Sequence, residues 1–330
     1  MRNPLVSVLL PVFNGEEFLK QTIESVLNQT FVNFEFIIID DGSTDSSRQI
    51  INSFDDQRIV FIENSENLQL IKTLNKGLEI AKGNYLARID ADDYMHPTRL
   101  EKQVHFLDAH MDYVLAGSSV QLVRDGIEIE GDIIKYYSDH DDIVFSMSFY
   151  CPFIHPTIML RMCIVREHQL KFDLGYLHAE DYEFWTRIVR YGKVYNLDEN
   201  LTYYRVHSNQ ISNVHLDFQK KQMKKIQVKF LNENLPYLNE QEKSCIFSIE
   251  NIYSSSVFYQ AIDKLSENIF FTGAAKERYL LKRVKNYMLE KKSFKLGEWR
   301  YILKNLFFYK ANFSFVQYLS FIIKTLNFKK

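Results

Sequence analysis

FIIIDDGSTD, residues 36–45, is the stretch that decides the fold of this chain. Its apolar part is short, continuous and β-branched, which is typical of a strand buried on both faces of a parallel sheet. YLARI, residues 85–89, runs in the same way into DADD, residues 90–93. Ligands of open α/β sheets bind at the carboxyl ends of such strands. We therefore expect five carboxylates to meet on one rim: Asp40, Asp41, Asp90, Asp92 and Asp93.

Carboxylates crowded in this way repel one another and raise one another's pKa values. The fold gains nothing from the arrangement unless a cation or a set of hydrogen-bond donors is also present. A hard divalent metal such as Mg²⁺ or Mn²⁺ takes oxygen ligands and keeps positions for substrate phosphates. The clusters therefore predict a metal site that receives a nucleotide diphosphate.

Composition limits the class of protein. The chain has 330 residues, 46% of them apolar and 25% charged, enough for one large core or two moderate ones. Its cysteines, Cys151, Cys163 and Cys245, form no CxxC pair, which favours a reducing, cytoplasmic setting. Residues 1–11 are interpreted as the first strand rather than as a targeting segment. No apolar run reaches the ~18 residues of a spanning helix, so we expect a soluble or membrane-attached protein.

Charge is unevenly distributed along the chain. Residues 276–330 hold 14 basic residues against three acidic ones, a net charge of +11. Since the whole chain has a net charge of −2, residues 1–275 carry −13. The same segment is rich in aromatic residues. This composition is typical of a helix that lies in an anionic membrane surface, although a solvated helical face over a small core has it too. No nucleic-acid-binding signature accompanies the charge, so nucleic acid is not an expected partner.

The hydrophobic pattern alternates between strands and helices up to about residue 120. The predicted elements are a strand at 6–10, a helix at 16–28, a strand ending at 40, a helix ending at 54, a strand at 58–63, a helix at 70–81 and a strand ending at 90. Glu16 and Glu17 suit the first turn of the first helix, and residues 43–45 offer N-cap chemistry for the second. Gly83 is predicted to close the third helix as its C-cap. The order predicts a parallel, right-handed, nucleotide-binding half.

VSVLLPVFNG at 6–15, DDGSTD at 40–45 and DADD at 90–93, in this order, resemble the family 2 glycosyltransferases of the GT-A fold. The similarity is greatest to bacterial enzymes that build lipooligosaccharide, O-antigen and capsule, and it covers about residues 4–215. It implies an α/β catalytic domain at 1–215, with a nucleotide-sugar half at 1–120 and an acceptor half at 121–215. Residues 216–330 are then a helical, basic and aromatic C-terminal region.

The resemblance also implies roles for single residues. The acidic pair Asp40 and Asp41 matches the positions that bind the uracil and ribose of a UDP-sugar, and Asp90 and Asp92 match the DXD motif that holds Mn²⁺ or Mg²⁺. The expected nucleotide-sugar contacts are Pro11, Phe13, Glu17, Asp40, Asp41, Arg88, Asp90, Ala91 and Arg205. The expected metal ligands are Asp90, Asp92 and His207.

GYLHAEDYEFW, residues 175–185, places two acids at the start of a predicted helix with an apolar stripe behind them. Acids there are also ordinary capping and dipole chemistry. The resemblance implies that Asp181 is the catalytic base of an inverting hexosyltransferase and that Glu180 is its neighbour. His207 is the candidate for the diphosphate or the metal, and His155 is expected to shape the acceptor side.

One position departs from the family pattern. Asn67-Leu68-Gln69 stands where the family often has Asn-x-Gly. The Gln predicts either a φ below zero or a different path of the loop. Either change would alter the donor pocket.

Three other classes of protein share part of this pattern. A receiver domain also has paired aspartates at a strand end, but it would be complete in about 120 residues. A catalytically silent scaffold with this fold would have no need of Asp90, Asp92 and Asp181. A sugar-nucleotide pyrophosphorylase would need a Gly-rich, basic loop, and residues 11–15 have one glycine and no lysine. The resemblance thus implies transfer from a UDP-sugar to a glycan or lipid-linked acceptor, and we expect a cytoplasmic protein peripheral to the inner membrane face.

Overall fold

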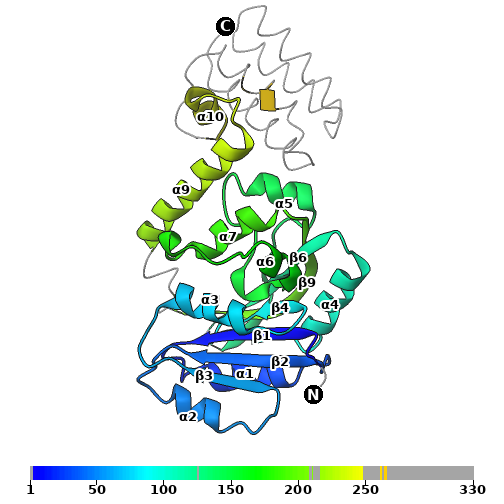
Figure 1. Ribbon diagram of the computed structural model, residues 1–330, viewed down its shortest axis with the longest axis vertical. Coiled ribbons are helices and arrows are strands. Elements are labelled where there is room, and N and C mark those ends of the chain that lie inside the picture. The colour runs from blue at the N-terminus through cyan, green and yellow to red at the C-terminus, as the bar shows by residue number, and fades with distance from the viewer. Residues whose placement is uncertain are drawn as a thin grey trace, which may run out of the picture. The chain divides into compact units, whose positions relative to one another are not determined.

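Strands and helices alternate through the first part of the computed structural model, which describes residues 3–124, 126–207, 210, 216–247, 261 and 264–265. The pairings among the first four strands are all parallel, in the order β3-β2-β1-β4. β1, β2 and β3 lie side by side in Figure 1. These elements are β1 (Val6–Val12), α1 (Leu19–Leu27), β2 (Phe34–Asp40), α2 (Ser47–Asn52), β3 (Ile59–Glu63), α3 (Leu70–Ile80) and β4 (Tyr85–Arg88). The predicted parallel half is confirmed.

Beyond β4 the sheet becomes mixed. β8 joins β4 and β6 by antiparallel pairing, whereas β6 and β9 run parallel to each other. The strands of this half are β5 (Tyr94–Met95), β6 (Tyr113–Arg124), β7 (Ile127–Ile134), β8 (Met159–Arg161) and β9 (Lys193–Val206). Its helices are α4 (Arg99–Ala109), α5 (His140–Ser146), η1 (His155–Thr157), α6 (Met162–Glu167), η2 (Leu174–Tyr176) and α7 (Glu180–Ile188).

β1 is buried over its whole length because helices cover both of its faces. Its even-numbered residues pack into the cluster that contains Leu19 and Ile23 of α1. Leu9 points the other way and packs on Gly77 of α3, where any side chain would collide with it. This two-sided burial explains the continuous apolar pattern of β1 and fixes where its carboxyl end emerges.

The loops after β1 and β2 are tied together by hydrogen bonds, and this corrects two predictions. Residues 43–45 were expected to cap the second helix, but the side chain of Ser43 accepts from the N–H of Asn14 and that of Asp45 from the N–H of Glu16. Only Asp45 also accepts from the N–H of Ser47, at the start of α2. α1 begins at Leu19 with no acid in its first turn, so Glu16 and Glu17 precede the helix.

Gly83 was expected to be a helix C-cap, and this is wrong. α3 ends at Ile80 with Ala81 as its C-cap, and Gly83 is not among the described residues with positive φ. A Cβ at Gly83 would lie 2.5 Å from the backbone nitrogen of Ser7. The glycine is therefore required because the chain passes against the start of β1.

The chain divides into two compact units, residues 1–236 and 237–330. The first unit ends with α9 (Leu216–Asn234), and the second contains α10 (Glu240–Phe247). The predicted boundary after residue 215 stays a prediction, and the basic segment 276–330 lies outside the described residues. Among the helices of the described residues, none combines the length and the apolar character that crossing a membrane requires.

Candidate functional site

A cleft of about 1030 Å³ lies at the carboxyl ends of β1 and β4. This volume is at the upper end of the usual range for ligand pockets, about 300–1000 Å³, so two substrates can share it. Most of the expected site residues line the cleft: Pro11, Phe13, Glu17, Asp41, Arg88, Asp90, Ala91, Asp92, His155, Glu180, Asp181 and His207. Asp40, Asp93 and Arg205 do not.

Asp41 lies on one wall, held by the loop that follows β3. Its Oδ1 accepts hydrogen bonds from Asn64 Nδ2 at 2.7 Å and from the N–H of Leu68 at 2.9 Å. Lys76 Nζ in turn donates to Asn64 Oδ1 at 2.6 Å. The hydrogen bonds to Oδ1 therefore fix the orientation of the carboxylate, and they leave its other oxygen, Oδ2, available to bind a ligand.

Asp40 is fully buried and takes a supporting position. Its Oδ2 accepts from Arg48 Nε at 2.7 Å, and both carboxylate oxygens face the N–H of Ser43. The two neighbouring aspartates at the end of β2 therefore differ: Asp41 faces the cleft, and Asp40 holds the turn that carries it. The role of Asp40 in binding nucleotide stays a prediction.

Gln69 borders the same wall with φ 72° and ψ 152°. The expectation of a φ below zero is therefore wrong. This region of backbone space is essentially confined to glycine, and other residues there carry strain of about 1–3 kcal/mol. The N–H of Gln69 donates to Asn67 Oδ1 at 2.8 Å, which stabilises the turn locally. The loop keeps a glycine-like conformation although Gln occupies the position.

Three aspartates gather after β4. Oxygen atoms of Asp90, Asp92 and Asp93 all lie within 4.8 Å of one another. Burial, and then the charge of Asp92, raise the pKa of Asp90 to about 6 against the opposing charge of Arg88. Burial likewise raises the pKa of Asp93 well above its usual value, and its Oδ2 has no hydrogen-bond partner among the described residues.

His207, at the end of β9, completes this group. Its Nε2 lies 3.0 Å from Asp92 Oδ2. The neighbouring Arg205 acts on the group from behind: its N–H donates to Asp93 Oδ1 at 2.9 Å, and its guanidinium donates to the backbone oxygen of Asp92 and to Gln21. Arg205 thus holds the backbone of the acidic turn, and its direct contact with nucleotide stays a prediction.

Arg88 is 3% exposed and lies at the end of β4. Its Nη1 donates to Asp90 Oδ2 at 2.6 Å, and its Nη2 makes a second contact to Asp90 Oδ1. Its charge also opposes the raised pKa values of Glu180 and Asp181. The guanidinium is therefore within electrostatic range of both acidic groups of the cleft.

Glu180 and Asp181 begin α7, as predicted, with Phe184, Trp185 and Ile188 fully buried behind them. Burial, and then the charge of Asp181, raise the pKa of Glu180 to about 7, and burial raises the pKa of Asp181 as well. Asp181 Oδ1 accepts from the N–H of Tyr182 at 2.7 Å.

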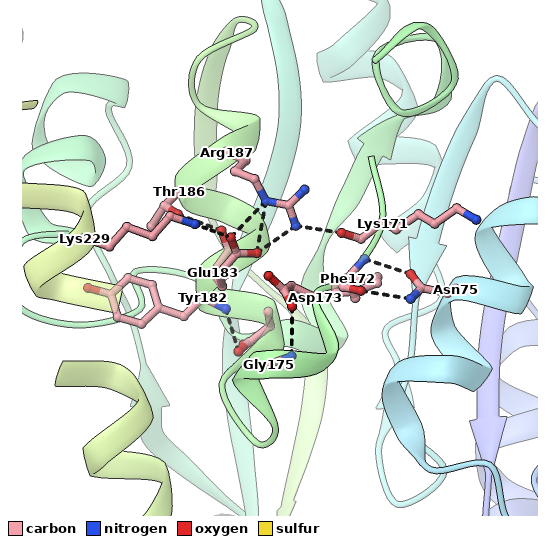
Figure 2. A network of polar contacts seen from close by, with 11 residues as sticks. Asn75, Lys171, Phe172, Asp173, Gly175, Tyr182, Glu183, Thr186, Arg187 and Lys229 are labelled. Carbon is pink, nitrogen blue, oxygen red and sulfur yellow. Dashed lines mark hydrogen bonds and ion pairs between the residues drawn. The ribbon is translucent and has the colours of Figure 1, made fainter. Parts of the chain in front are cut away.

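α7 is anchored from its rear by the network in Figure 2. The buried carboxylate of Glu183 accepts from Arg187 at 2.7 Å and from Lys229 of α9 at 3.1 Å. Arg187 also donates to the backbone oxygen of Lys171 at 2.7 Å. These contacts fix the helix that carries Glu180 and Asp181 to α9 and to the segment before η2.

Sequence reasoning missed several residues that line the cleft. Tyr136 and Tyr150 stack with ring centroids 5.7 Å apart, and Gln219 and Met223 of α9 line the cleft as well. Cys151, used in the sequence only as a sign of a reducing setting, donates from its Sγ to Asp181 Oδ2 at 3.8 Å. These residues come from irregular segments and from a helix assigned to another region, so no local pattern marked them.

His155 also lines the cleft and packs edge-on against Trp185, with ring centroids 5.7 Å apart. Burial lowers the pKa of His155 well below its usual value. The imidazole is therefore neutral at physiological pH. Its position on the acceptor side stays a prediction.

Comparisons with known proteins agree on one family. The sequence pattern of glycosyl transferase family 2 matches residues 7–163. An uncharacterized glycosyltransferase of Haemophilus influenzae is 38% identical over 243 residues, which cover 71% of this chain and 74% of that protein. WfaP of Escherichia coli, named as a UDP-Glc:α-D-GlcNAc-diphosphoundecaprenol β-1,3-glucosyltransferase, is 33% identical over 210 residues, 63% of this chain and 80% of its own.

Solved structures show the same fold. TarS of S. aureus in complex with UDP superposes with a TM-score of 0.53 at 19% identity, covering 85% of this chain and 82% of the other. The mannosyltransferase PcManGT of Pyrobaculum calidifontis, in complex with GDP-Man and Mn²⁺, gives a TM-score of 0.50 at 13% identity, covering 100% of this chain and 89% of its own. The chain belongs to glycosyl transferase family 2 and is a glycosyltransferase of the GT-A fold.

Proposed function

We propose that this glycosyltransferase is inverting and metal-dependent, and that it moves a hexose or N-acetylhexosamine from a UDP-sugar to a hydroxyl of a bacterial surface glycan precursor. One observation carries the proposal. A single cleft is lined by Asp41, by Asp90 and Asp92, and by Glu180 and Asp181. It thus offers a nucleotide wall, a cation site and a base in one space large enough for donor and acceptor.

The acidic group fits a divalent metal. Its oxygens lie within 4.8 Å of one another, Asp93 has a buried oxygen without a partner among the described residues, and His207 lies 3.0 Å from Asp92. Hard cations such as Mg²⁺ and Mn²⁺ prefer carboxylate oxygens, which this group offers. We assign Asp90, Asp92 and His207 as ligands. A bound cation would supply charge that offsets the leaving diphosphate.

The chain's own residues do the rest. Asp41 orients the nucleoside through its second oxygen. Asp181, with a pKa raised by burial, is the base that takes the proton of the acceptor hydroxyl as that oxygen attacks the anomeric carbon from the face opposite UDP. Glu180, with a pKa of about 7, can stay protonated beside it and donate a hydrogen bond to the acceptor.

The relatives support the donor and the acceptor class. TarS has been solved in complex with UDP-GlcNAc. WfaP is named for transfer from UDP-Glc to a diphosphoundecaprenol-linked sugar, and TuaG of Bacillus subtilis is named for teichuronic acid biosynthesis. We propose that the reaction takes place at the cytoplasmic face of the membrane, on a glycan precursor of the lipooligosaccharide, O-antigen or capsule type.

Slow hydrolysis of UDP-sugars in the presence of Mn²⁺ tests the proposal, because it requires no knowledge of the acceptor. EDTA should abolish the hydrolysis, and added Mn²⁺ or Mg²⁺ should restore it. Hydrolysis that continues undiminished in chelator would remove the metal from the proposal.

Asp181→Asn separates chemistry from binding. We expect UDP affinity close to that of the parent protein and a kcat for transfer about 100- to 10,000-fold lower, the usual range for a lost general base. Asp41→Asn should instead weaken UDP binding. Asp198→Asn, at an exposed ion pair with Lys135, is the matched control and should change neither quantity. Equal losses of UDP affinity in the first two variants would mean that Asp181 has a structural role.

A further inference from the structure

α9 has two faces with different environments. Gln219 and Met223 line the cleft, and Ile226 and Phe230 are buried. The opposite face is basic, with Lys220, Lys221, Lys224 and Lys225 all exposed. Within the described part of the chain, none of these four lysines takes part in an ion pair or hydrogen bond.

Apolar side chains adjoin this basic face. Leu216 is 47% exposed and Phe218 is 44% exposed at the start of the helix, and Val228 is 41% exposed further along it. A surface helix that serves only solubility usually alternates basic and acidic residues, which support each other at i and i+4. The first ten residues of α9 contain a single acid, Asp217. Basic residues beside exposed apolar ones are the pattern of a helix that lies on an anionic lipid surface.

The helix is also fixed to the catalytic residues. Lys229 binds Glu183 of α7 at 3.1 Å, Gln219 donates to the backbone oxygen of His178 at 2.9 Å, and Gln227 donates to that of Phe149 at 2.5 Å (Figure 2 shows the first of these). The position of α9 on any surface therefore determines how the cleft and Glu180 are presented to it.

We propose that the α9 basic face, formed by Lys220, Lys221, Lys224 and Lys225 with Leu216 and Phe218 beside them, docks on an anionic phospholipid membrane and so sets how far the cleft, which the other face of α9 lines, stands from the headgroups that carry the acceptor. The lysines bind lipid phosphates, and Phe218 enters the interface. The acceptor part of this inference rests on the proposed function. The docking itself does not, because it is measured without turnover.

The experiment uses the full chain and sedimentation with phosphatidylcholine vesicles, with or without phosphatidylglycerol, at low salt. Each lysine at an anionic surface contributes about fivefold to affinity. The quadruple variant Lys220→Gln, Lys221→Gln, Lys224→Gln and Lys225→Gln should therefore have an affinity for anionic vesicles that is lower by a factor of ~100 or more. Gln suits a helix nearly as well as Lys, so α9 should keep its structure.

A matched control removes the same charge elsewhere. Lys20, Lys82, Lys171 and Lys193 are exposed and lie outside α9, and their joint change to Gln should alter vesicle affinity by less than about threefold. Both quadruple variants should hydrolyse UDP-sugar at the rate of the parent protein. If no protein, the parent included, hydrolyses any UDP-sugar, the proposed function fails while the vesicle result still decides the docking.

Three results would overturn the inference. The α9 variant could bind anionic vesicles as tightly as the parent protein, which would assign binding to another part of the chain. The control variant could lose as much affinity as the α9 variant, which would make net charge the cause. Duplex DNA could bind the parent as tightly as vesicles do and be lost in the same variant, which would make the face a general polyanion site.

Discussion

Arg187→Gln is expected to destabilise residues 1–236 more than Glu183→Gln does, although both changes break the same ion pair. The side chain of Glu183 is 1% exposed, whereas those of Arg187 and Lys229 are 24% and 36% exposed. Without Glu183, both cations can reach water. Without Arg187, the buried carboxylate keeps only Lys229, and the contact of Arg187 with the Phe184 ring at 5.1 Å is lost as well.

The magnitudes follow from these burials. Leaving a charge buried and poorly paired costs about 3–5 kcal/mol, and we expect Arg187→Gln to lie near the lower end because Lys229 remains. Glu183→Gln loses charge-assisted hydrogen bonds whose partners become solvated, for which about 1.5–3 kcal/mol is appropriate. Lys171→Gln breaks only an exposed pair with Glu79 and should cost less than about 0.5 kcal/mol.

Urea unfolding followed by tryptophan fluorescence measures these differences. The chain has two tryptophans, so a Trp299→Phe background leaves Trp185, which is buried in α7 beside the network. All variants are compared in that background. Equal losses for Arg187→Gln and Glu183→Gln, or a larger loss for Glu183→Gln, would refute the argument from unequal burial.

Three further predictions concern the cleft. Gln69→Gly should raise the free energy of unfolding by about 1 kcal/mol, because it removes backbone strain of about 1–3 kcal/mol and adds the entropy of a glycine in the unfolded chain; urea unfolding measures it, and a loss of stability would contradict the strain. Glu180→Gln should stabilise the protein near pH 8 by on the order of 1–3 kcal/mol. The pKa of Glu180 in the folded protein, about 7, exceeds its ordinary value of 4.5. The contribution of protonated Glu180 to the free energy of unfolding is therefore fully present below about pH 4.5 and is lost as the pH rises to about 7. Unfolding curves across that range should show the advantage vanish at low pH, and a constant difference would count against it. Arg205→Lys should weaken the apparent Mn²⁺ affinity in donor hydrolysis by about tenfold, since it loses the hold on the backbone of Asp92; an unchanged Mn²⁺ titration would show that this support is dispensable.

The parallel half of the fold was predictable because both faces of its strands are buried. A strand covered by α1 and α3 must be mostly apolar, and such a run is visible in β1 and in β2, where two buried polar residues, Ser7 and Glu35, hydrogen-bond to each other. The acids that follow β2 and β4 then share one end of the sheet by geometry alone. For the same reason the placement of Asp41, Asp90 and Asp92 around one cleft could be expected.

The roles of single residues at turns were harder to predict. Gly83 could be a cap or a point of close approach, and only the distance to β1 decides between them. Asp40 and Asp41 are neighbours of the same type, but Asp40, the last residue of β2, binds Arg48, and Asp41, just beyond the strand, lines the cleft. The cleft wall formed by Gln219 and Met223 depends on α9 meeting α7, where Lys229 pairs with Glu183, 46 positions earlier in the chain; no local pattern encodes such a long-range contact.

The ion pair between Glu183 and Lys229 bears on how the enzyme can be cut for study. A fragment that stops at residue 215 would lack Gln219 and Met223 from the cleft wall and would leave Glu183 with Arg187 alone. Such a fragment should express poorly, although it contains every acid assigned to the site. A fragment that runs through Pro236 keeps the whole first unit, and it is the one to take into crystallisation trials with nucleotide and metal.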